Sequence, residues 1–288
     1  MAKDRRANIV GYQHGTLRES RSKPMMEISL LQAILSVLSG AAVGFTLGLL
    51  GGGGSILAVP LLLYVVGLPN AHVAIGTGAL AVAANAFVNL AQHARNDTVK
   101  WPCAIVFAVA GIFGAWLGST MGKAIEGDRL LFLFALIMIA VGVAMLMRRS
   151  GEGDPSVRIT PAIGVRLAGI GFLTGLLSGF FGIGGGFLIV PGIMLGSGMA
   201  ILNAVGSSLL SVGAFGTATA ANYAISGLVD WSVAGLFIVG GIAGGALGMR
   251  VAVRLASRKG MLTRIFASVI FAVAAYMLYQ IGSKFFRH

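Results

Sequence analysis

Charged residues are scarce in this sequence of 288 residues: they make up 10 % of it, whereas 57 % is apolar. Soluble domains carry about 25 % charged residues. No Asp, Glu, Lys or Arg occurs among the 67 residues Ile28–Ala94 or the 63 residues Leu167–Val229. Such stretches cannot form a water-exposed surface, which excludes soluble enzymes, soluble nucleic-acid-binding proteins and disordered tails. They indicate a multi-pass membrane protein, because a bilayer core requires stretches of about 20 apolar residues.

Cysteine and carboxylates are also rare. The single cysteine, Cys103, excludes an internal disulfide and a metal site built from cysteines. No Ser-His-Asp set, carboxylate pair or metal-ligand cluster occurs, so we expect no enzyme activity, metal or cofactor. The six acidic residues after residue 27 fall in expected loops, which leaves a cation or proton relay through intramembrane carboxylates unsupported. They are Asp97, Glu126, Asp128, Glu152, Asp154 and Asp230.

Basic residues outnumber acidic ones by 21 to 9, giving a net charge of +12. They lie between the apolar segments and in residues 1–27, a polar basic extension without the apolar run of a signal peptide. We therefore expect an anionic membrane surface or an anionic solute as partner, not nucleic acid. The positive-inside rule places the side carrying Arg95 and Arg250 in the cytoplasm, whereas the basic tail favours the reverse, so the orientation stays open.

Ten apolar segments follow the extension, five in residues 28–150 and five in residues 151–288, which predicts an all-α polytopic membrane protein. The second segment of each set has about 14 residues. At 1.5 Å per residue it covers about 21 Å, less than the roughly 30 Å of a hydrocarbon core, so we expect half-helices or re-entrant elements. The segments are Ile28–Leu50, Gly53–Val66, Ala71–Ala94, Trp101–Gly122, Leu130–Met147, Pro161–Phe181, Gly184–Ser197, Leu202–Ser226, Trp231–Val253 and Met261–Gly282.

The two sets are copies of each other. Because five segments per copy is an odd number, we expect the copies to be inverted. Paired short, glycine-interrupted segments in duplicated halves point to the central site of a transporter. At an offset of 131 residues, Gly44, Gly48, Gly51, Gly53, Gly54 and Pro60 match Gly175, Gly179, Gly182, Gly184, Gly185 and Pro191; at an offset of 130, Gly76, Thr77, Trp101, Gly111, Gly114 and Gly118 match Gly206, Ser207, Trp231, Gly241, Gly244 and Gly248.

Contiguous glycines at residues 51–54 and 184–186 are the first candidate site. Adjacent glycines form a poor helix, so the backbone can open and present N–H groups, next to the positive end of a helix dipole. Such irregular backbone is tolerated in a membrane where it lines a cavity or is buried in protein. The spaced pairs Gly44/Gly48 and Gly114/Gly118 are instead typical of close helix packing.

Polar residues of the third segment in each copy are the second candidate site. Asn85, Asn89 and Gln92 are expected to share a helix face that His93 flanks. The sequence does not distinguish between two roles for these residues, hydrogen bonding between helices and lining of a pore. His93 is the titratable residue expected within a span, and a structural donor is favoured over a proton carrier.

The paired motif Gly-x-x-x-Gly-x-x-Gly-x-Gly-Gly-(Gly/Ser), followed by Val-Pro, resembles the TauE/SafE family of sulfite exporters. Each motif is followed by a Gly-Thr/Ser step and a segment that begins at a tryptophan. The second copy, residues 179–187, is the closer match, and the first departs at Gly52 and Ser55. The resemblance implies a bacterial inner-membrane permease for sulfite, sulfoacetate, related organosulfonates or thiosulfate, driven by an ion gradient.

The leading hypothesis is a secondary transporter that exports its substrate. In this hypothesis the two glycine clusters meet near the bilayer midplane. Its partners would be a small sulfur-containing oxyanion, H⁺ or Na⁺ as coupling ion, and the lipid bilayer. Uptake, a passive anion channel and a non-transporting scaffold are the alternatives. The expected substrate-binding residues are Gly51, Gly53, Gly54, Ser55, Thr77, Asn89, His93, Gly182, Gly184, Gly185, Gly186, Ser207, Ser208 and Asn222.

Overall fold

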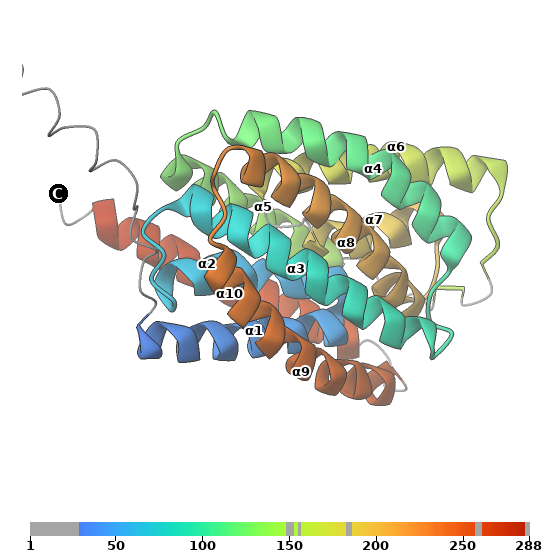
Figure 1. Ribbon diagram of the computed structural model, residues 1–288. Coiled ribbons are helices and arrows are strands. Elements are labelled where there is room, and N and C mark those ends of the chain that lie inside the picture. The colour runs from blue at the N-terminus through green and yellow to red at the C-terminus, as the bar shows by residue number, and fades with distance from the viewer. Residues whose placement is uncertain (1–28, 148–152, 155–156, 183–185, 257–260, 286–288) are drawn as a thin grey trace, which may run out of the picture. The chain divides into compact units, whose positions relative to one another are not determined.

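The computed structural model describes residues 29–147, 153–154, 157–182, 186–256 and 261–285. These residues form helices and no β-strand, apart from one isolated bridge between Asp154 and Met199. The all-α prediction is confirmed, and no segment end differs from its expected place by more than three residues. The helices are α1 Leu30–Leu50, η1 Gly51–Leu57, α2 Ala58–Tyr64, α3 Ala71–Ala94, α4 Trp101–Gly122, α5 Gly127–Met147, α6 Pro161–Phe181, α7 Gly186–Ser197, α8 Ile201–Ile225, α9 Trp231–Ala256 and α10 Met261–Phe285 (Figure 1).

Six helical stretches in the described part of the chain are long and apolar enough to cross a membrane. Shorter apolar stretches lie in α5, α7 and α10. Asp128 was expected in a loop but lies in the first turn of α5, where the helix begins one residue before it. The six stretches are Leu30–Tyr64, Ala71–Ala94, Trp101–Gly122, Pro161–Phe181, Ile201–Ile225 and Trp231–Leu255.

The chain reverses direction after α1, so that η1 and α2 return along it. Gly54 lies against the backbone of Thr46 and Leu47, and the Thr46 hydroxyl donates to the Gly54 carbonyl at 3.1 Å. η1 is a 3₁₀ helix with a rise of about 2.0 Å per residue, so η1 and α2 together cover about 24 Å. The short segment therefore reaches further than the 21 Å expected of an α-helix.

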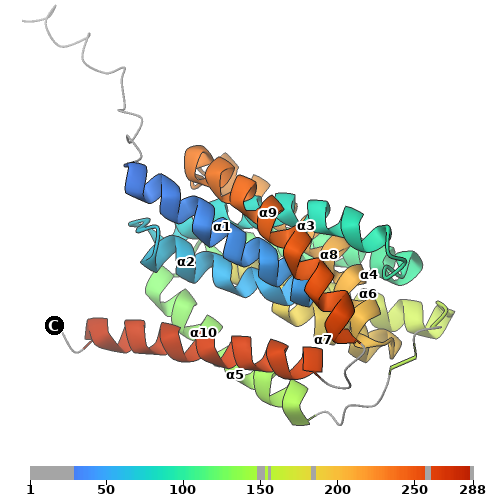
Figure 2. The ribbon, with the colours of Figure 1, turned by 90° about the horizontal axis from the view of Figure 1, so that it is seen from below.

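Helices α3 and α8 form the central pair and run antiparallel. Gly76 near the start of α3 contacts Leu228 just after α8, and Gly206 near the start of α8 contacts Thr98 just after α3. α4 and α6 pack together on one flank of this pair. α5 and α10 pair with each other further out (Figure 2).

Two glycine seams hold the outer helices close. On α1, a Cβ at Gly44 would overlap the backbone of Gly241 on α9, and one at Gly48 would lie 2.8 Å from the Met249 nitrogen. On α4, Gly114 and Gly118 lie in the same way against the backbone of α6. The expectation that these spaced glycines serve helix packing is therefore confirmed.

Candidate functional site

Each half has a left-handed glycine where its first helix ends. Gly51 has φ +61° and Gly182 has φ +66°, and the two residues match at the offset of 131. A left-handed backbone strains any residue with a Cβ, so glycine is required at both positions. The expectation that the glycine-rich segments redirect the backbone holds at these two turns.

The first glycine turn is bonded to the other half of the chain. The Gly52 N–H donates to the Ser208 hydroxyl on α8 at 2.9 Å, and that hydroxyl donates to the Val205 carbonyl at 2.7 Å. The Ser55 hydroxyl donates to the Gly52 carbonyl at 2.9 Å. Gly51, Gly53, Gly54, Ser55 and Ser208 are all buried. The structure thus brings five predicted residues from two halves into one cluster.

The two glycine turns do not meet. Gly51 lies against Val205, near the start of α8, whereas Gly182 lies against Ile75, near the start of α3. Because α3 and α8 are antiparallel, these places are at opposite ends of the pair. His93, whose ring reaches Gly48 beside the first turn, is 18 positions after Ile75, so the turns are about 27 Å apart along α3. The expected midplane meeting is therefore wrong for Gly51 and Gly182, although η1 and α7, which contain other glycines of the two clusters, do pack together.

Gly184 and Gly185 lie outside the described residues, and Gly186 is the first residue of α7. No geometry is assigned to the first two. Gly186 fits the expectation of a helix that begins directly after the second glycine cluster.

Thr77 and Ser207 fasten loops of the opposite half. The Asp230 N–H donates to the Thr77 hydroxyl at 2.9 Å, and the Lys100 N–H donates to the Ser207 hydroxyl at 2.8 Å. Neither residue caps its helix: Asn70 caps α3, accepting from the His72 N–H at 2.8 Å, and Ala200 is the N-cap residue of α8. The two hydroxyls hold the loops that precede α4 and α9.

One face of α3 is polar and fully buried. It carries Asn85, Asn89 and His93 at intervals of four residues, each with 0 % exposure. Gln92, which was expected on this face, is half-buried and lies beside it. The wrong assignment came from the spacing of three between Asn89 and Gln92, which suits a helix face as well as the spacing of four to His93.

The His93 ring joins the end of α3 to the end of α1. Its Nε2 lies 3.0 Å from the Gly48 carbonyl, which can only accept, so Nε2 carries the hydrogen in the neutral ring. Nδ1 lies 3.0 Å from the Thr98 hydroxyl, which donates to the His93 carbonyl at 2.9 Å. This arrangement fits the structural donor that the sequence favours.

Asn222 lies far from the first glycine turn. It is 14 residues after Ser208 on α8, which is about 21 Å along the helix. Its amide donates to the Ser119 and Thr120 hydroxyls at 2.7 and 2.8 Å and accepts from Lys123 Nζ at 2.7 Å. The structure therefore places Asn222 in a contact between α4 and α8, apart from the first glycine turn.

Lys123 is the residue of this contact that the sequence analysis missed. Its ammonium also donates to the Asn222 carbonyl at 3.1 Å and to the Ser226 hydroxyl at 2.8 Å. These bonds also set a positive charge at the carbonyl end of α8, where the helix dipole favours it. Its position directly after α4 was the available signal, but its partners lie about 100 residues away.

Replacing Lys123 with methionine is expected to lower the melting temperature in detergent. The substitution keeps most of the side-chain length but removes a charged donor, and hydrogen bonds to charged groups contribute about 1.5–3 kcal/mol. Arg129→Met in the first turn of α5 is the control, since the Arg129–Glu126 pair is 79 % and 67 % exposed and exposed pairs contribute about 0–1 kcal/mol. Equal melting temperatures for the two variants would contradict this role of Lys123.

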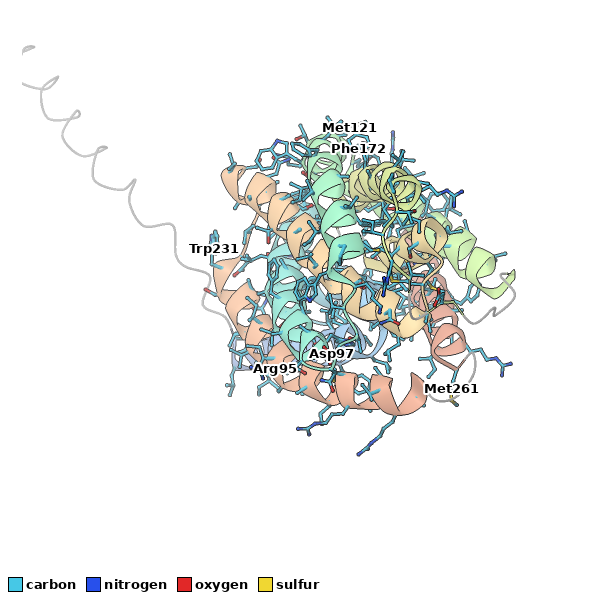
Figure 3. All side chains as sticks on the ribbon, turned by 90° about the vertical axis from the view of Figure 1, so that its right-hand side faces the viewer. Arg95, Asp97, Met121, Phe172, Trp231 and Met261 are labelled. Carbon is cyan, nitrogen blue, oxygen red and sulfur yellow. The ribbon has the colours of Figure 1, made fainter. Side chains whose placement is uncertain are left out.

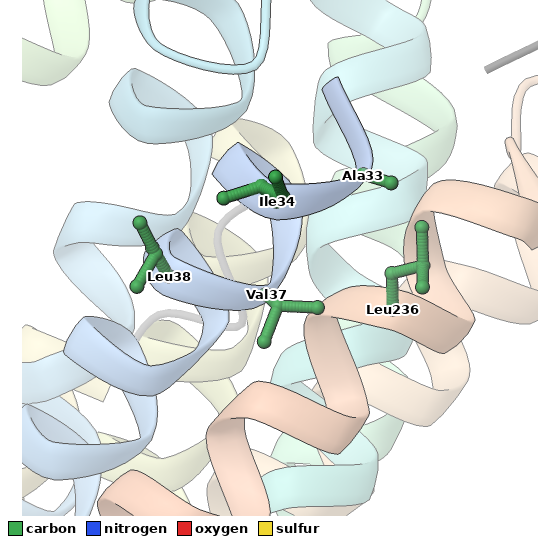
Figure 4. A pocket seen from close by; sticks show the side chains of 5 residues that line it. All are labelled: Ala33, Ile34, Val37, Leu38 and Leu236. Atoms are coloured by element: carbon green, nitrogen blue, oxygen red, sulfur yellow. The ribbon is translucent and has the colours of Figure 1, made fainter. Parts of the chain in front are cut away.

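A pocket of about 270 Å³ lies on the outer side of α1 and α9 (Figure 4). Every lining residue is aliphatic, and Leu38 is 60 % exposed, so the pocket offers no donor to an anion and faces the lipid. Its lining residues are Ala33, Ile34, Val37, Leu38 and Leu236.

Two tryptophans begin matched helices at the surface. Trp101 is the first residue of α4 and is 45 % exposed, and Trp231 is the first residue of α9 and is 66 % exposed. Trp231 points outward from the helices (Figure 3). Both positions suit aromatic anchors at a membrane–water interface, as expected from the sequence.

Comparison with known proteins decides the family. The family profile described as "Sulfite exporter TauE/SafE" matches residues 36–277, which is most of the chain and nearly all of its described helices. The chain belongs to the TauE/SafE sulfite exporter family. As a TauE/SafE protein with six membrane-crossing stretches, it is a multi-pass membrane transporter.

Relatives of this TauE/SafE protein have matching names. A "Probable membrane transporter protein" of Xylella fastidiosa (strain 9a5c) is 50 % identical over 254 residues, covering 88 % of this chain and 97 % of the relative. "Probable membrane transporter protein YunE" of Bacillus subtilis (strain 168) is 23 % identical over 271 residues, covering 86 % and 97 %. A Haemophilus influenzae protein of the same kind is 26 % identical over 181 residues, covering 61 % and 67 %.

Proposed function

We propose that this TauE/SafE protein is a secondary transporter of small sulfur-containing oxyanions, such as sulfite, sulfoacetate or related organosulfonates. It would export them from the cell, driven by a gradient of H⁺ or Na⁺. The observation that carries the proposal is the family match over residues 36–277, because the family's description names sulfite export.

Charge supports an anion as the substrate. Among the described residues, the carboxylates Asp97, Glu126, Asp154 and Asp230 lie outside the helices, and Asp128 lies in the first turn of its helix. An oxyanion that crosses the helix interior would therefore meet no carboxylate of the described residues. Buried amides, hydroxyls and backbone N–H groups are the donors available to replace its hydration shell.

The proposed binding groups form two sets near opposite ends of the α3–α8 pair. Gly51, Gly53, Gly54 and Ser55 with Ser208 form the first set, and Gly182 belongs to the second, whereas Gly184 and Gly185 lie outside the described residues. The Gly52 N–H already donates to Ser208, so its donation to an anion would require the hydroxyl to turn away. Alternating access would open the path to one end of the helix pair and then to the other.

Sulfite flux into proteoliposomes tests the proposal. Purified protein is reconstituted, sulfite is added outside, and its accumulation is followed with an imposed pH or Na⁺ gradient and with no gradient, against protein-free liposomes. Accumulation that requires one of the gradients is the expected result. Flux that follows the membrane potential alone would indicate a channel instead, and no flux of any sulfur oxyanion under any gradient would refute transport of this class.

A further inference from the structure

A polar amide lies close to the middle of the central helix α3. The helix extends from residue 71 to residue 94, so Asn85 is about 4 Å from its midpoint. Asn85 and Asn89, one turn further, both have 0 % exposure. Polar groups at this depth of a membrane protein are costly and commonly mark the path of a substrate.

Three atoms of these amides lack a hydrogen-bond partner among the described residues: Asn85 Nδ2, Asn85 Oδ1 and Asn89 Oδ1. Only Asn89 Nδ2 is paired, donating to the Asn85 carbonyl at 2.8 Å. Neither the donor nor the acceptor of the Asn85 amide is paired. Buried polar groups are nearly always satisfied, so this amide requires an explanation.

Both amides are directed into the glycine seam between α1 and α9. A Cβ at Gly241 would collide with the Asn85 amide. A Cβ at Gly245 would lie 2.6 Å from the Asn89 amide, and one at Gly48 would lie 2.9 Å from Asn89 Oδ1. The glycines therefore leave space for the amides where a larger residue would displace them.

The second half fills the matching place with an apolar ring. At the offset of 130, Phe215 matches Asn85 and Gly111 matches Gly241. Phe215 packs against Gly111, and its ring lies 6.2 Å from that of Phe107. Matching glycine surroundings thus accommodate an apolar side chain with no unpaired atom, which argues against a purely structural need for Asn85.

Thr219, which matches Asn89, also has an unpaired hydroxyl among the described residues. A hydroxyl in a helix can turn to donate to the carbonyl four residues earlier. An amide that did the same would still leave its carbonyl oxygen unpaired. The Asn85 amide is therefore the group that needs an external partner.

We propose that the Asn85 and Asn89 amides bind the transported anion in its singly protonated form. The ligand must supply an acceptor for Nδ2 and a donor for Oδ1. Hydrogensulfite, in its hydroxyl form, offers both, whereas doubly charged sulfite offers only acceptors and a metal cation offers no acceptor. The inference rests on the proposed transport of sulfur oxyanions and narrows it. The proton would cross on the anion itself, so an inward Na⁺ gradient, and not an inward H⁺ gradient, would drive export of this form.

The first test is Asn85→Leu in the sulfite proteoliposome assay. An apolar group of similar shape removes the unpaired atoms, so the melting temperature is expected to stay equal or rise while sulfite flux falls about tenfold or more. Thr219→Val is the matched control in the other half and should keep flux within about twofold of the unsubstituted protein. Unchanged flux in Asn85→Leu would overturn the proposal and leave the proposed function standing.

The second test concerns the proton. At constant total sulfite, flux should fall as rising pH converts hydrogensulfite to sulfite, and methanesulfonate, which carries no proton, should compete about tenfold more weakly or worse. Equal competition by methanesulfonate would overturn the proposal that the protonated anion is the bound form.

His93, one turn from Asn89, is the titratable group nearest along α3, and α1 carries no charged residue. Arg250 and Arg254 are exposed near the end of α9.

His93→Gln separates the two sources of pH dependence. If the anion carries the proton, the slope of flux against pH stays the same in this variant, whatever the absolute rate. Loss of the slope would assign the proton to His93 and overturn the proposal. Absence of sulfite flux in the unsubstituted protein would overturn this inference together with the proposed function. The measurement on the unsubstituted protein therefore separates failure of the proposed function from failure of this inference alone.

Discussion

Gly51→Ala is expected to lower the melting temperature strongly. The left-handed φ of +61° costs a residue with a Cβ about 1–2 kcal/mol. The new methyl would also lie 2.6 Å from the Ser208 hydroxyl and 2.6 Å from the Val205 carbonyl. Such crowding adds about 1–3 kcal/mol, and it would break the bond between Ser208 and the Gly52 N–H. The sum is about 2–5 kcal/mol, measured as thermal melting of the purified protein in detergent.

Gly67→Ala is the control for Gly51→Ala. Gly67 has φ +80°, and a Cβ there would meet nothing within 4 Å. It reports the backbone cost alone, about 1–2 kcal/mol. The difference between the two variants then measures the crowding against α8. Equal losses of stability would show that the turn does not depend on its contact with the second half.

The second large effect is expected for Gly244→Leu in the seam between α1 and α9. A Cβ at Gly244 would overlap the backbone of Ala41, and a leucine would force the two helices apart. Since close backbone approach is what holds membrane helices together, we expect a loss of about 3 kcal/mol or failure to fold. The measurement is the yield of monodisperse protein, with its melting temperature where enough is recovered.

Gly235→Leu on the same helix is the matched control. Gly235 is exposed, and a Cβ there would meet nothing within 4 Å. A leucine at this lipid-facing position should leave the yield and the melting temperature close to those of the unsubstituted protein. If both leucine variants behave alike, the seam is not what holds α9 against α1.

The fold was predictable because its signals are local. Hydropathy alone sets the helix boundaries, as for α3 and α4, whose observed bounds equal the expected ones. The interruption of the helix at Gly51 was predictable because contiguous glycines form a poor helix wherever they occur. The length of the first short segment was underestimated, since the 3₁₀ geometry of η1 is not encoded in its apolar pattern.

The candidate site was predictable only in part. Ser208 and the first glycine cluster were both identified, and they are bonded to each other. The partners of Asn222, however, lie on α4, more than 100 residues away in the chain. The position of Lys123 directly after α4 was its one local signal, but nothing near it in the sequence identifies α8 as its neighbour.

The sequence by itself determined that this protein lies in a membrane, how many helical segments it has, where its backbone turns and to which family it belongs. These properties depend on residue type and on short-range order. Only the tertiary structure decided that the two glycine turns lie at opposite ends of α3 and α8, and that the Asn85 amide faces a seam without a partner among the described residues. Such facts follow from which helices pack together and in which direction, and packing of this kind joins residues that are far apart in the chain.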